Sequence, residues 1–480
     1  MNPTIRPMAR ARTKVVATVG PACLQRAQLA ELVIAGVDVF RLNMAHGDLD
    51  THAHTLADIR ALEQELAQPI GVLADLAGPK IRLGELPGDV LRCSVGDEFS
   101  FVRGHGTTMT ELETTYGPLV DELAVGDTVM LADGTVGMKV FEKTSDRARV
   151  RVVQPGEIRS RQGLNLPGVK LSAPSMDDED RAHAAWAAQQ GVDFIGLSFV
   201  REPRDVVELK QLVAGHGSRA GVIAKIEKPE ALEKLDAIVV EADGLMVARG
   251  DLGVEIDIAR VPIVQKQIIA KCREHQKPVI IATQMLDSMQ HSPRPTRAEV
   301  TDVANAILDG GDACMLSGET AIGQYPRASV EMMNRVALET EALFRDRPRT
   351  VQGARVLAGL HPMTSAVVEG AGLIAARLDA RLIVMASHTG ATAQAVSKQR
   401  NFVPTVGISD SVVTLRKMCL DWGVIPLLGI PTETNTAILE AVSSWGMQAG
   451  MLASGDYVVL VAGTGLQAGS HNGVLVHRVP

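Results

Sequence analysis

The sequence is poor in aromatic residues and cysteines, and it has no long apolar run. Phe, Trp and Tyr make up 3% of its 480 residues, too few for a protein that stacks single-stranded bases on aromatic side chains. The five cysteines are scattered without metal-ligand spacing, which is typical of reduced thiols and predicts a cytoplasmic protein. No apolar run reaches about 18 residues, so we expect no membrane-spanning helix.

The sequence also lacks an excess of positive charge. Lys and Arg total 48 against 56 Asp and Glu, which gives a formal net charge of −8. Nucleic acids and membrane surfaces are bound by broad basic surfaces, so we expect neither as a partner. The composition, 46% apolar and 22% charged, is that of a folded globular chain, and the length predicts about three domains.

Eight short apolar runs alternate with helix-like segments. Apolar runs bounded by turn residues are typical of parallel strands buried on both faces. Eight strand–helix alternations predict an α/β fold of the (β/α)₈ TIM-barrel type, and a long open doubly wound sheet is the alternative. The runs begin at Lys14, Val37, Ile70, Val192, Gly221, Gly244, Pro278 and Gly311.

Two further regions interrupt or follow this series. About 120 residues separate the third and fourth runs, and their alternating pattern predicts a small β-barrel lid domain inserted at 83–170. A second strand–helix series after a linker at 345–361 predicts a three-layer α/β regulatory domain. We therefore expect a discontinuous catalytic barrel (1–82 and 171–345), the insert (83–170) and a C-terminal domain (346–480).

Polar and charged residues follow the predicted barrel strands. In TIM barrels the chemistry gathers at the carboxyl ends of the strands, so we expect these side chains to converge. Residues two apart on a strand share a face, which predicts that Lys225 points with Glu227 and Arg249 with Asp251. Each residue alone is explained as a solvated strand end or an ion pair. The set is Arg41, Asn43, Asp75, Lys225, Glu227, Arg249, Asp251, Thr283, Gln284, Ser317 and Glu319.

The residue types favour phosphoryl transfer. Glu227 and Asp251 are suited to a hard cation such as Mg²⁺, and Arg41, Arg82 and Lys225 provide donors for phosphate. Cations and a metal pair with no obvious nucleophile match a reaction in which positioning and charge neutralisation dominate.

Long motifs in this order resemble the pyruvate kinase family. They are TKVVATVGPA, RLNMAHG, DLAGPKIR, NLPG, AKIEKPEAL, MVARGDLGVEI, ATQMLDSM, PTRAEVTDVANAILDG and SGETAIGQYP. The resemblance implies Mg²⁺-dependent phosphoryl transfer, with Mn²⁺ as a substitute, from phosphoenolpyruvate to ADP. The products are pyruvate and ATP, in the last step of glycolysis. The resemblance also implies the three-domain architecture and an allosteric homotetramer.

The resemblance assigns roles by motif. Lys225, Thr283 and Arg41 would be catalytic, and Arg41, Lys225, Gly250, Asp251 and Thr283 would bind the substrate. Glu227 and Asp251 would bind the metal. Asn43, His46, Arg82 and Asp133 would face the nucleotide, and Arg249, Ser317 and Glu319 would support the site from behind.

One departure from the family pattern concerns the monovalent cation. Many members bind K⁺ through residues that match Asn43, Ala45, Asp75 and Leu76, so two of the usual oxygen ligands are replaced by apolar side chains. Lys80 stands where the family has Glu. We predict that its ammonium replaces K⁺, which is then not required. In the alternative, Lys80 points to solvent and the cation site is weaker.

A Ser/Thr/Gly loop in the C-terminal domain resembles the family's effector-phosphate loop. It contains Ser387, Thr389, Gly390 and Thr392, and loop amides at a helix N-terminus bind phosphate. The alternative is an ordinary helix N-cap. The last loops lack the Trp and Arg of the family's bisphosphate site, which predicts a monophosphate effector, such as a sugar monophosphate or AMP, or none.

Two other functions remain open at this point. One is a Mg²⁺-dependent lyase or aldolase of TIM-barrel type acting on pyruvate or phosphoenolpyruvate, which would not need the nucleotide-facing residues. The other is a catalytically silent effector-binding protein, which predicts loss of Lys225 or of the metal pair.

Overall fold

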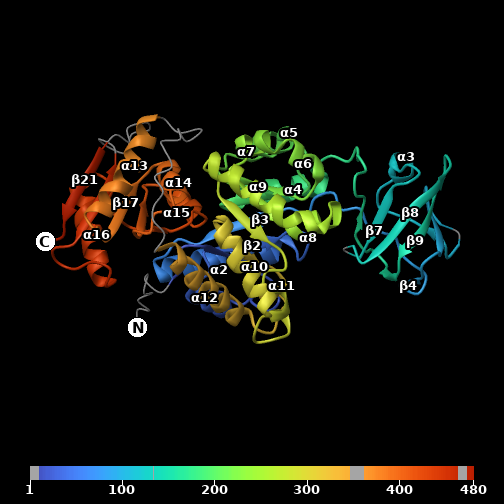
Figure 1. Ribbon diagram of the computed structural model, residues 1–480, viewed down its shortest axis with the longest axis horizontal. Helices are drawn as coiled ribbons and strands as arrows, with labels where there is room; N and C mark the ends of the chain where they lie inside the picture. Colours follow the sequence, from blue (N-terminus) through green and yellow to red (C-terminus); the bar gives the residue numbers. More distant parts are fainter. Residues whose placement is uncertain (1–9, 107, 133, 346–361, 463–472) are drawn as a thin grey trace.

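The computed structural model describes residues 10–106, 108–132, 134–345, 362–462 and 473–480. Three bodies lie in a row, with the barrel between the inserted sheet and the C-terminal domain (Figure 1). The predicted linker 345–361 falls almost entirely outside the described residues, as does Asp133.

The central body is a closed eight-stranded barrel, so the predicted TIM-barrel class is confirmed and the open sheet is not formed. Each predicted run forms one strand, and the strands pair in parallel in the order β1-β16-β15-β14-β13-β12-β3-β2. The strands are β1 (Lys14–Thr18), β2 (Val39–Asn43), β3 (Gly71–Asp75), β12 (Phe194–Leu197), β13 (Gly221–Ile226), β14 (Gly244–Ala248), β15 (Val279–Ala282) and β16 (Ala313–Leu316).

Strand periodicity divides the barrel core into two layers. Val15 and Ala17 pack outward against the helices, whereas Val16 packs inward with Leu73 and Ile223. The surrounding helices are α1 (Arg26–Ala35), α2 (Leu49–Leu66), α4 (Asp178–Gln190), α5 (Pro203–Gly215), α6 (Pro229–Glu233), α7 (Leu235–Glu241), α8 (Arg249–Glu255), α9 (Val261–Glu274), α10 (Arg297–Asp309), α11 (Gly318–Ala321) and α12 (Pro326–Arg345), with 3₁₀ turns at Ile258–Arg260 and Asp287–Gln290.

The insert between β3 and β12 is a mainly β body with its own apolar core, which includes Phe101, Val129 and Val150. Its six-stranded sheet has the order β11-β7-β8-β9-β5-β6, and β10 pairs with β4. The elements are β4 (Val90–Cys93), β5 (Glu98–Val102), β6 (Glu111–Leu112), α3 (Leu119–Glu122), β7 (Thr128–Leu131), β8 (Val136–Lys143), β9 (Arg147–Gln154), β10 (Gly156–Arg159) and β11 (Leu164–Asn165).

The C-terminal body is the predicted three-layer α/β domain. Its sheet has the order β19-β18-β17-β20-β21. Alternate residues of β17 face opposite layers, because Ile383 packs in one apolar cluster and Val384 in another. The elements are α13 (Pro362–Arg377), β17 (Leu382–Ala386), α14 (Ala391–Lys398), β18 (Thr405–Ile408), α15 (Val412–Met418), β19 (Val424–Pro426), α16 (Asn435–Gln448), β20 (Tyr457–Ala462) and β21 (Gly473–Arg478).

This domain docks on the amino-terminal end of the barrel, opposite the strand ends for which the sequence predicts chemistry. Cys419 and Leu420 belong to the same apolar cluster as the inward-facing barrel residues. The ammonium of Lys14, at the start of β1, donates to the carbonyl of Val424 over 2.8 Å. Within the described residues, no helix combines the length and apolarity needed to cross a membrane.

Candidate active site

Lys225 lies at the centre of a charged cluster at the carboxyl ends of the barrel strands. Its Nζ lies 3.1 Å from Glu227 Oε1 and 3.4 Å from Asp75 Oδ1, and it donates to Ser198 Oγ over 2.6 Å. Lys225 and Glu227 therefore share a face, as strand periodicity predicts. Burial would lower the pKa of Lys225, but the two carboxylates outweigh it and raise that pKa, so the side chain stays cationic.

Asp75 joins this cluster to Arg41. The Arg41 guanidinium donates to Asp75 Oδ2 over 2.6 Å and to Thr18 Oγ1 over 3.1 Å. Burial opposes ionisation of Asp75, yet Lys225 and Arg41 together hold its pKa below the usual value. Asp75 is thus an ionised, buried counter-ion that fixes the spacing of two cations.

Glu227 and Asp251 form a carboxylate pair beside Lys225. The backbone amide of Phe199 donates to Glu227 Oε2 over 2.7 Å. Burial, together with the charge of Asp251, raises the pKa of Glu227 despite the opposing effect of Lys225. A divalent cation would relieve that repulsion, so the pair fits a metal. The pair suits Mg²⁺, since this ion commonly binds one or two carboxylates and completes its shell with water and phosphate.

The expectation that Arg249 points with Asp251 is wrong. β14 ends at Ala248, and helix α8 begins at Arg249, so helical rather than strand periodicity separates the two side chains. The Arg249 guanidinium lies 2.7 Å from Asp302 Oδ2 on α10. It also donates to the carbonyls of Ala282, over 3.2 Å, and Thr283, over 2.7 Å.

Thr283 is held in an unusual backbone conformation directly after β15. Its φ is +69° and that of Gln284 is +52°, a region that non-glycine residues adopt at a cost and that clusters at functional sites. The Gly250 amide, expected to face an anion, instead donates to Thr283 Oγ1 over 2.7 Å. A substrate carboxylate that used this amide would have to displace the hydroxyl.

Ser317 and Glu319 lie at the end of β16, as expected. The buried Glu319 carboxylate accepts from the amides of Leu286, over 2.9 Å, and Ser317, over 2.7 Å. It ties the loop after β15 to the loop after β16. Burial raises the pKa of Glu319.

Of the residues predicted for the nucleotide and K⁺ sites, Asp75 belongs to the cluster, and Asn43 lies opposite it in register at the ends of β2 and β3. Asn43 Oδ1 accepts from the Ala45 amide over 3.3 Å, and His46 is exposed on the loop after β2. Arg82 pairs with Gly163 where the chain enters and leaves the insert, and it donates to the Arg161 carbonyl over 3.2 Å. Lys80 is exposed, and its side chain lies beside Gly163.

Sequence reasoning missed three residues of the cluster. Ser198 bridges Lys225 and the Leu76 carbonyl, to which it donates over 2.7 Å. Thr18 follows the same pattern at the end of β1, where it contacts Arg41. Both positions are strand ends, so the rule that found the charged residues could have found them. Asp302, on α10, carried no such signal.

The predicted effector loop precedes α14. The Gly390 amide donates to Ser387 Oγ over 3.0 Å, and Gly390 has φ +86°. Ser387 and Thr392 are buried, whereas Thr389 is exposed. The N-cap of α14 is Gly390 and no side chain caps the helix, so the Ser387 contact is a turn within the loop and not the side-chain cap of the alternative interpretation.

Comparison with known proteins adds two family matches. Residues 10–330 match the family described as "Pyruvate kinase, barrel domain". Residues 365–477 match "Pyruvate kinase, alpha/beta domain".

Individual relatives extend over nearly the whole chain. A pyruvate kinase from Agrobacterium vitis is 42% identical over 468 residues, covering 97% of this chain and 98% of that one. One from Bacillus licheniformis is 38% identical over 473 residues, covering 98% and 80%. The crystal structure of a pyruvate kinase from Cryptosporidium parvum superposes with a TM-score of 0.89 at 32% identity, covering 100% of this chain and 98% of that one.

Proposed function

The chain belongs to the pyruvate kinase family and transfers a phosphoryl group from phosphoenolpyruvate to ADP, and we propose that the cluster around Lys225 carries out this reaction. The observation that supports the placement is the convergence of Arg41, Lys225, Glu227 and Asp251 at one mouth of the barrel. The lyase and silent-protein alternatives are not favoured, because the relatives are kinases.

The proposed reaction breaks the bond between the phosphoryl group and the enol oxygen of phosphoenolpyruvate. A terminal phosphate oxygen of ADP attacks the phosphorus, and the enolpyruvate then takes a proton at its methylene carbon. Arg41 and Lys225 hold the transferring phosphoryl group and the developing enolate charge, which a low-dielectric site stabilises strongly. Gly250 and Thr283 orient the substrate carboxylate, and the Thr283 hydroxyl lies on the proton path.

Members of this family generally use Mg²⁺ and K⁺. Glu227 and Asp251 are the residues that we propose hold Mg²⁺ or Mn²⁺ in this chain. When bound, the divalent ion supplies charge neutralisation on the phosphate oxygens. The Phe199 amide and Lys225 hold the Glu227 carboxylate in place, so that carboxylate would set where the ion lies.

K⁺ independence is a separate proposal. Lys80 would supply the positive charge of the monovalent ion near Asp75, where Ala45 and Leu76 provide no oxygen ligand. Its side chain lies beside Gly163 in this structure, so the proposal requires it to turn toward the barrel mouth when the insert closes. Kinetics with phosphoenolpyruvate, ADP and Mg²⁺ in tetramethylammonium buffer test this, and strong activation by added K⁺ would contradict it.

The nucleotide site is proposed at Asn43, His46 and Arg82, with Asp133 from the insert. Arg82 forms a backbone bridge with Gly163, between the segment that enters the insert and the segment that leaves it. Movement of the insert would therefore bring Arg82 toward the nucleotide phosphates.

The remaining expectations concern organisation. We propose domain bounds of 1–82 with 171–345, 83–170 and 346–480, which the three separate apolar cores support. We also propose a cytoplasmic homotetramer. Ser387, Thr389, Gly390 and Thr392 would bind a monophosphate effector such as a sugar monophosphate or AMP.

The decisive experiment couples pyruvate formation to NADH oxidation by lactate dehydrogenase. Phosphoenolpyruvate, ADP and Mg²⁺ together should give pyruvate and an equal amount of ATP. Omission of ADP, or chelation with EDTA, should abolish the signal. Pyruvate released without ADP would indicate a phosphatase or lyase instead.

A further inference from the structure

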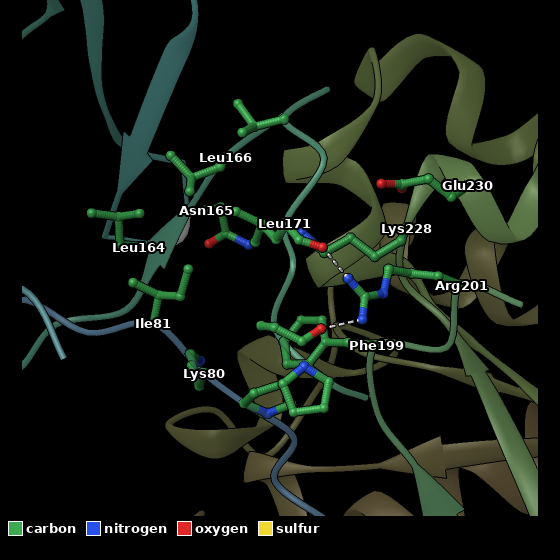
Figure 2. A pocket seen from close by; sticks show the side chains of 14 residues that line it. Lys80, Ile81, Leu164, Asn165, Leu166, Leu171, Phe199, Arg201, Lys228 and Glu230 are labelled. Atoms are coloured by element: carbon green, nitrogen blue, oxygen red, sulfur yellow. Dashed lines mark hydrogen bonds between the residues drawn. The ribbon is translucent and has the colours of Figure 1, made fainter. Parts of the chain in front are cut away.

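We infer that the hinge between the insert and the barrel holds a second binding site, for a small amphipathic monoanion. A pocket lies there, between the insert and the barrel, and domain boundaries are a preferred place for small-molecule sites. One wall comes from the two chain crossings, residues 79–81 and 164–174, and the other from barrel residues that follow β12 and β13 (Figure 2).

The wall of the pocket is mainly apolar. Side chains from both crossings line it together with Phe199 of the barrel (Figure 2). Such a wall favours an aryl or branched alkyl group, because burying that surface removes it from water. The apolar side chains that carry this argument are Ile81, Leu164, Leu166, Val169 and Leu171.

The charges at the pocket favour an anion. Three cations, Lys80, Arg201 and Lys228, face one acid, Glu230. Lys228 is already paired with Glu255 over 2.7 Å. Lys80 is exposed and has no ion pair with any residue that the structure describes.

Arg201 is also committed to the protein. It donates to the carbonyl of Leu171 over 2.7 Å and to that of Ala173 (Figure 2). Lys80 is therefore the cation left to meet a carboxylate, sulfonate or phosphate, while the apolar part of the ligand lies against Leu171 and Phe199.

This pocket is distinct from the phosphoryl-transfer site but shares a wall with it. Phe199 lines the pocket, and its backbone amide donates to Glu227. Across the hinge, Asn165 of the insert donates to Glu255 of α8 over 3.2 Å. An occupant would therefore touch both moving parts and change how readily the insert closes, without competing for the substrate site.

Binding of 8-anilinonaphthalene-1-sulfonate, an aromatic monoanion that fluoresces in apolar surroundings, tests the inference on the full chain. Lys80→Met should weaken binding about two- to fivefold, the range for one exposed ion pair. Leu171→Glu should weaken it more than tenfold, because it places a carboxylate in the pocket. Lys139→Met, which removes an exposed lysine on β8, is the matched control and should bind as the parent does.

Two further titrations serve as controls. One distinguishes binding in this pocket from binding at the nucleotide site, and the other distinguishes binding that depends on the charge of the dye from binding that does not. The fluorescence should persist with saturating MgADP, and neutral N-phenyl-1-naphthylamine should not distinguish Lys80→Met from the parent. Circular dichroism and thermal midpoints of the variants establish that each is folded. Displacement by MgADP, or equal affinity of Lys80→Met, Leu171→Glu and Lys139→Met, would overturn the inference. Titrations are made without K⁺ or phosphoenolpyruvate, so their outcome is independent of the proposed catalytic role of Lys80.

Discussion

Arg416 of the C-terminal domain and Glu63 of the barrel form a two-hydrogen-bond ion pair across the boundary between their domains. The guanidinium Nε and Nη2 donate to the two carboxylate oxygens over 2.9 and 2.6 Å, and the Glu63 side chain is fully buried. The C-terminal domain is thereby tied to the end of the barrel opposite the proposed active site.

The first prediction concerns this pair. Arg416→Met leaves the Glu63 carboxylate buried without its main partner, so we expect the free energy of unfolding to fall by about 3 kcal/mol. Arg26→Met is the matched control. Arg26 pairs with Glu65, which lies on α2 as Glu63 does, but this pair is exposed to solvent, where an ion pair is worth at most about 1 kcal/mol. Urea unfolding followed by tryptophan fluorescence measures both, and equal losses would contradict the prediction.

The second prediction concerns Asp421, buried in the C-terminal domain near Lys398, Asp312 and Lys14. Burial raises the pKa of Asp421 to about 8 from 3.8. Between these values the native state holds a proton that the unfolded state releases, so the native state loses stability as the pH rises from about 4 to 8.

Asp421→Asn removes that dependence while keeping the shape of the neutral acid. We expect the variant and the parent to have equal thermal midpoints below about pH 4, and the variant to be more stable at pH 8 by an amount on the order of a few kcal/mol. Parallel stability curves over this pH range would count against a raised pKa.

The third prediction concerns Lys225. Lys225→Met removes the cation that we propose holds the transferring phosphoryl group, and we expect kcat to fall by about 10³-fold or more. Lys234→Met removes a lysine exposed to solvent and paired with Glu202, and should behave as the parent in the coupled assay. Residual activity of Lys225→Met within tenfold of the parent would remove Lys225 from the mechanism.

The fourth prediction concerns Arg249 as a positioning residue. Arg249→Lys loses part of the fork that holds the carbonyls of Ala282 and Thr283, so Thr283 is expected to relax from its positive φ. We expect kcat to fall about 10- to 100-fold, the cost of one or two charge-assisted hydrogen bonds, with little change in the KM for ADP. A change confined to KM would instead indicate a binding role.

The fifth prediction concerns the proposed effector loop. Thr389→Glu places a negative charge where a phosphate would bind. We expect the activity of this variant to be the same with and without glucose 6-phosphate or AMP, whereas the parent is activated. Thr434→Glu, at the N-terminus of α16 in the same domain, is the control and should be activated as the parent is. An unchanged response of Thr389→Glu would contradict a phosphate site in this loop.

Local periodicity explains which parts of the site sequence reasoning reached. Strand alternation predicts that Lys225 and Glu227 share a face, and their charged atoms lie 3.1 Å apart, because β13 continues almost to Glu227. The same reasoning fails for Arg249 and Asp251, because the chain changes from strand to helix at Arg249. Ser198 carries no comparable signal, because a hydroxyl costs much less to bury in an apolar run than a charge does.

The sequence by itself determined the eight strands, the insertion, the third domain and the charged residues at the strand ends. These follow from apolar periodicity and from the cost of burying charge, which act locally. Only the tertiary structure decided partners and directions. Asp75 lies between Arg41 and Lys225, and Lys80 lies beside Gly163. Such contacts join residues far apart in the chain, and the closure of the barrel and the path of the hinge fix them.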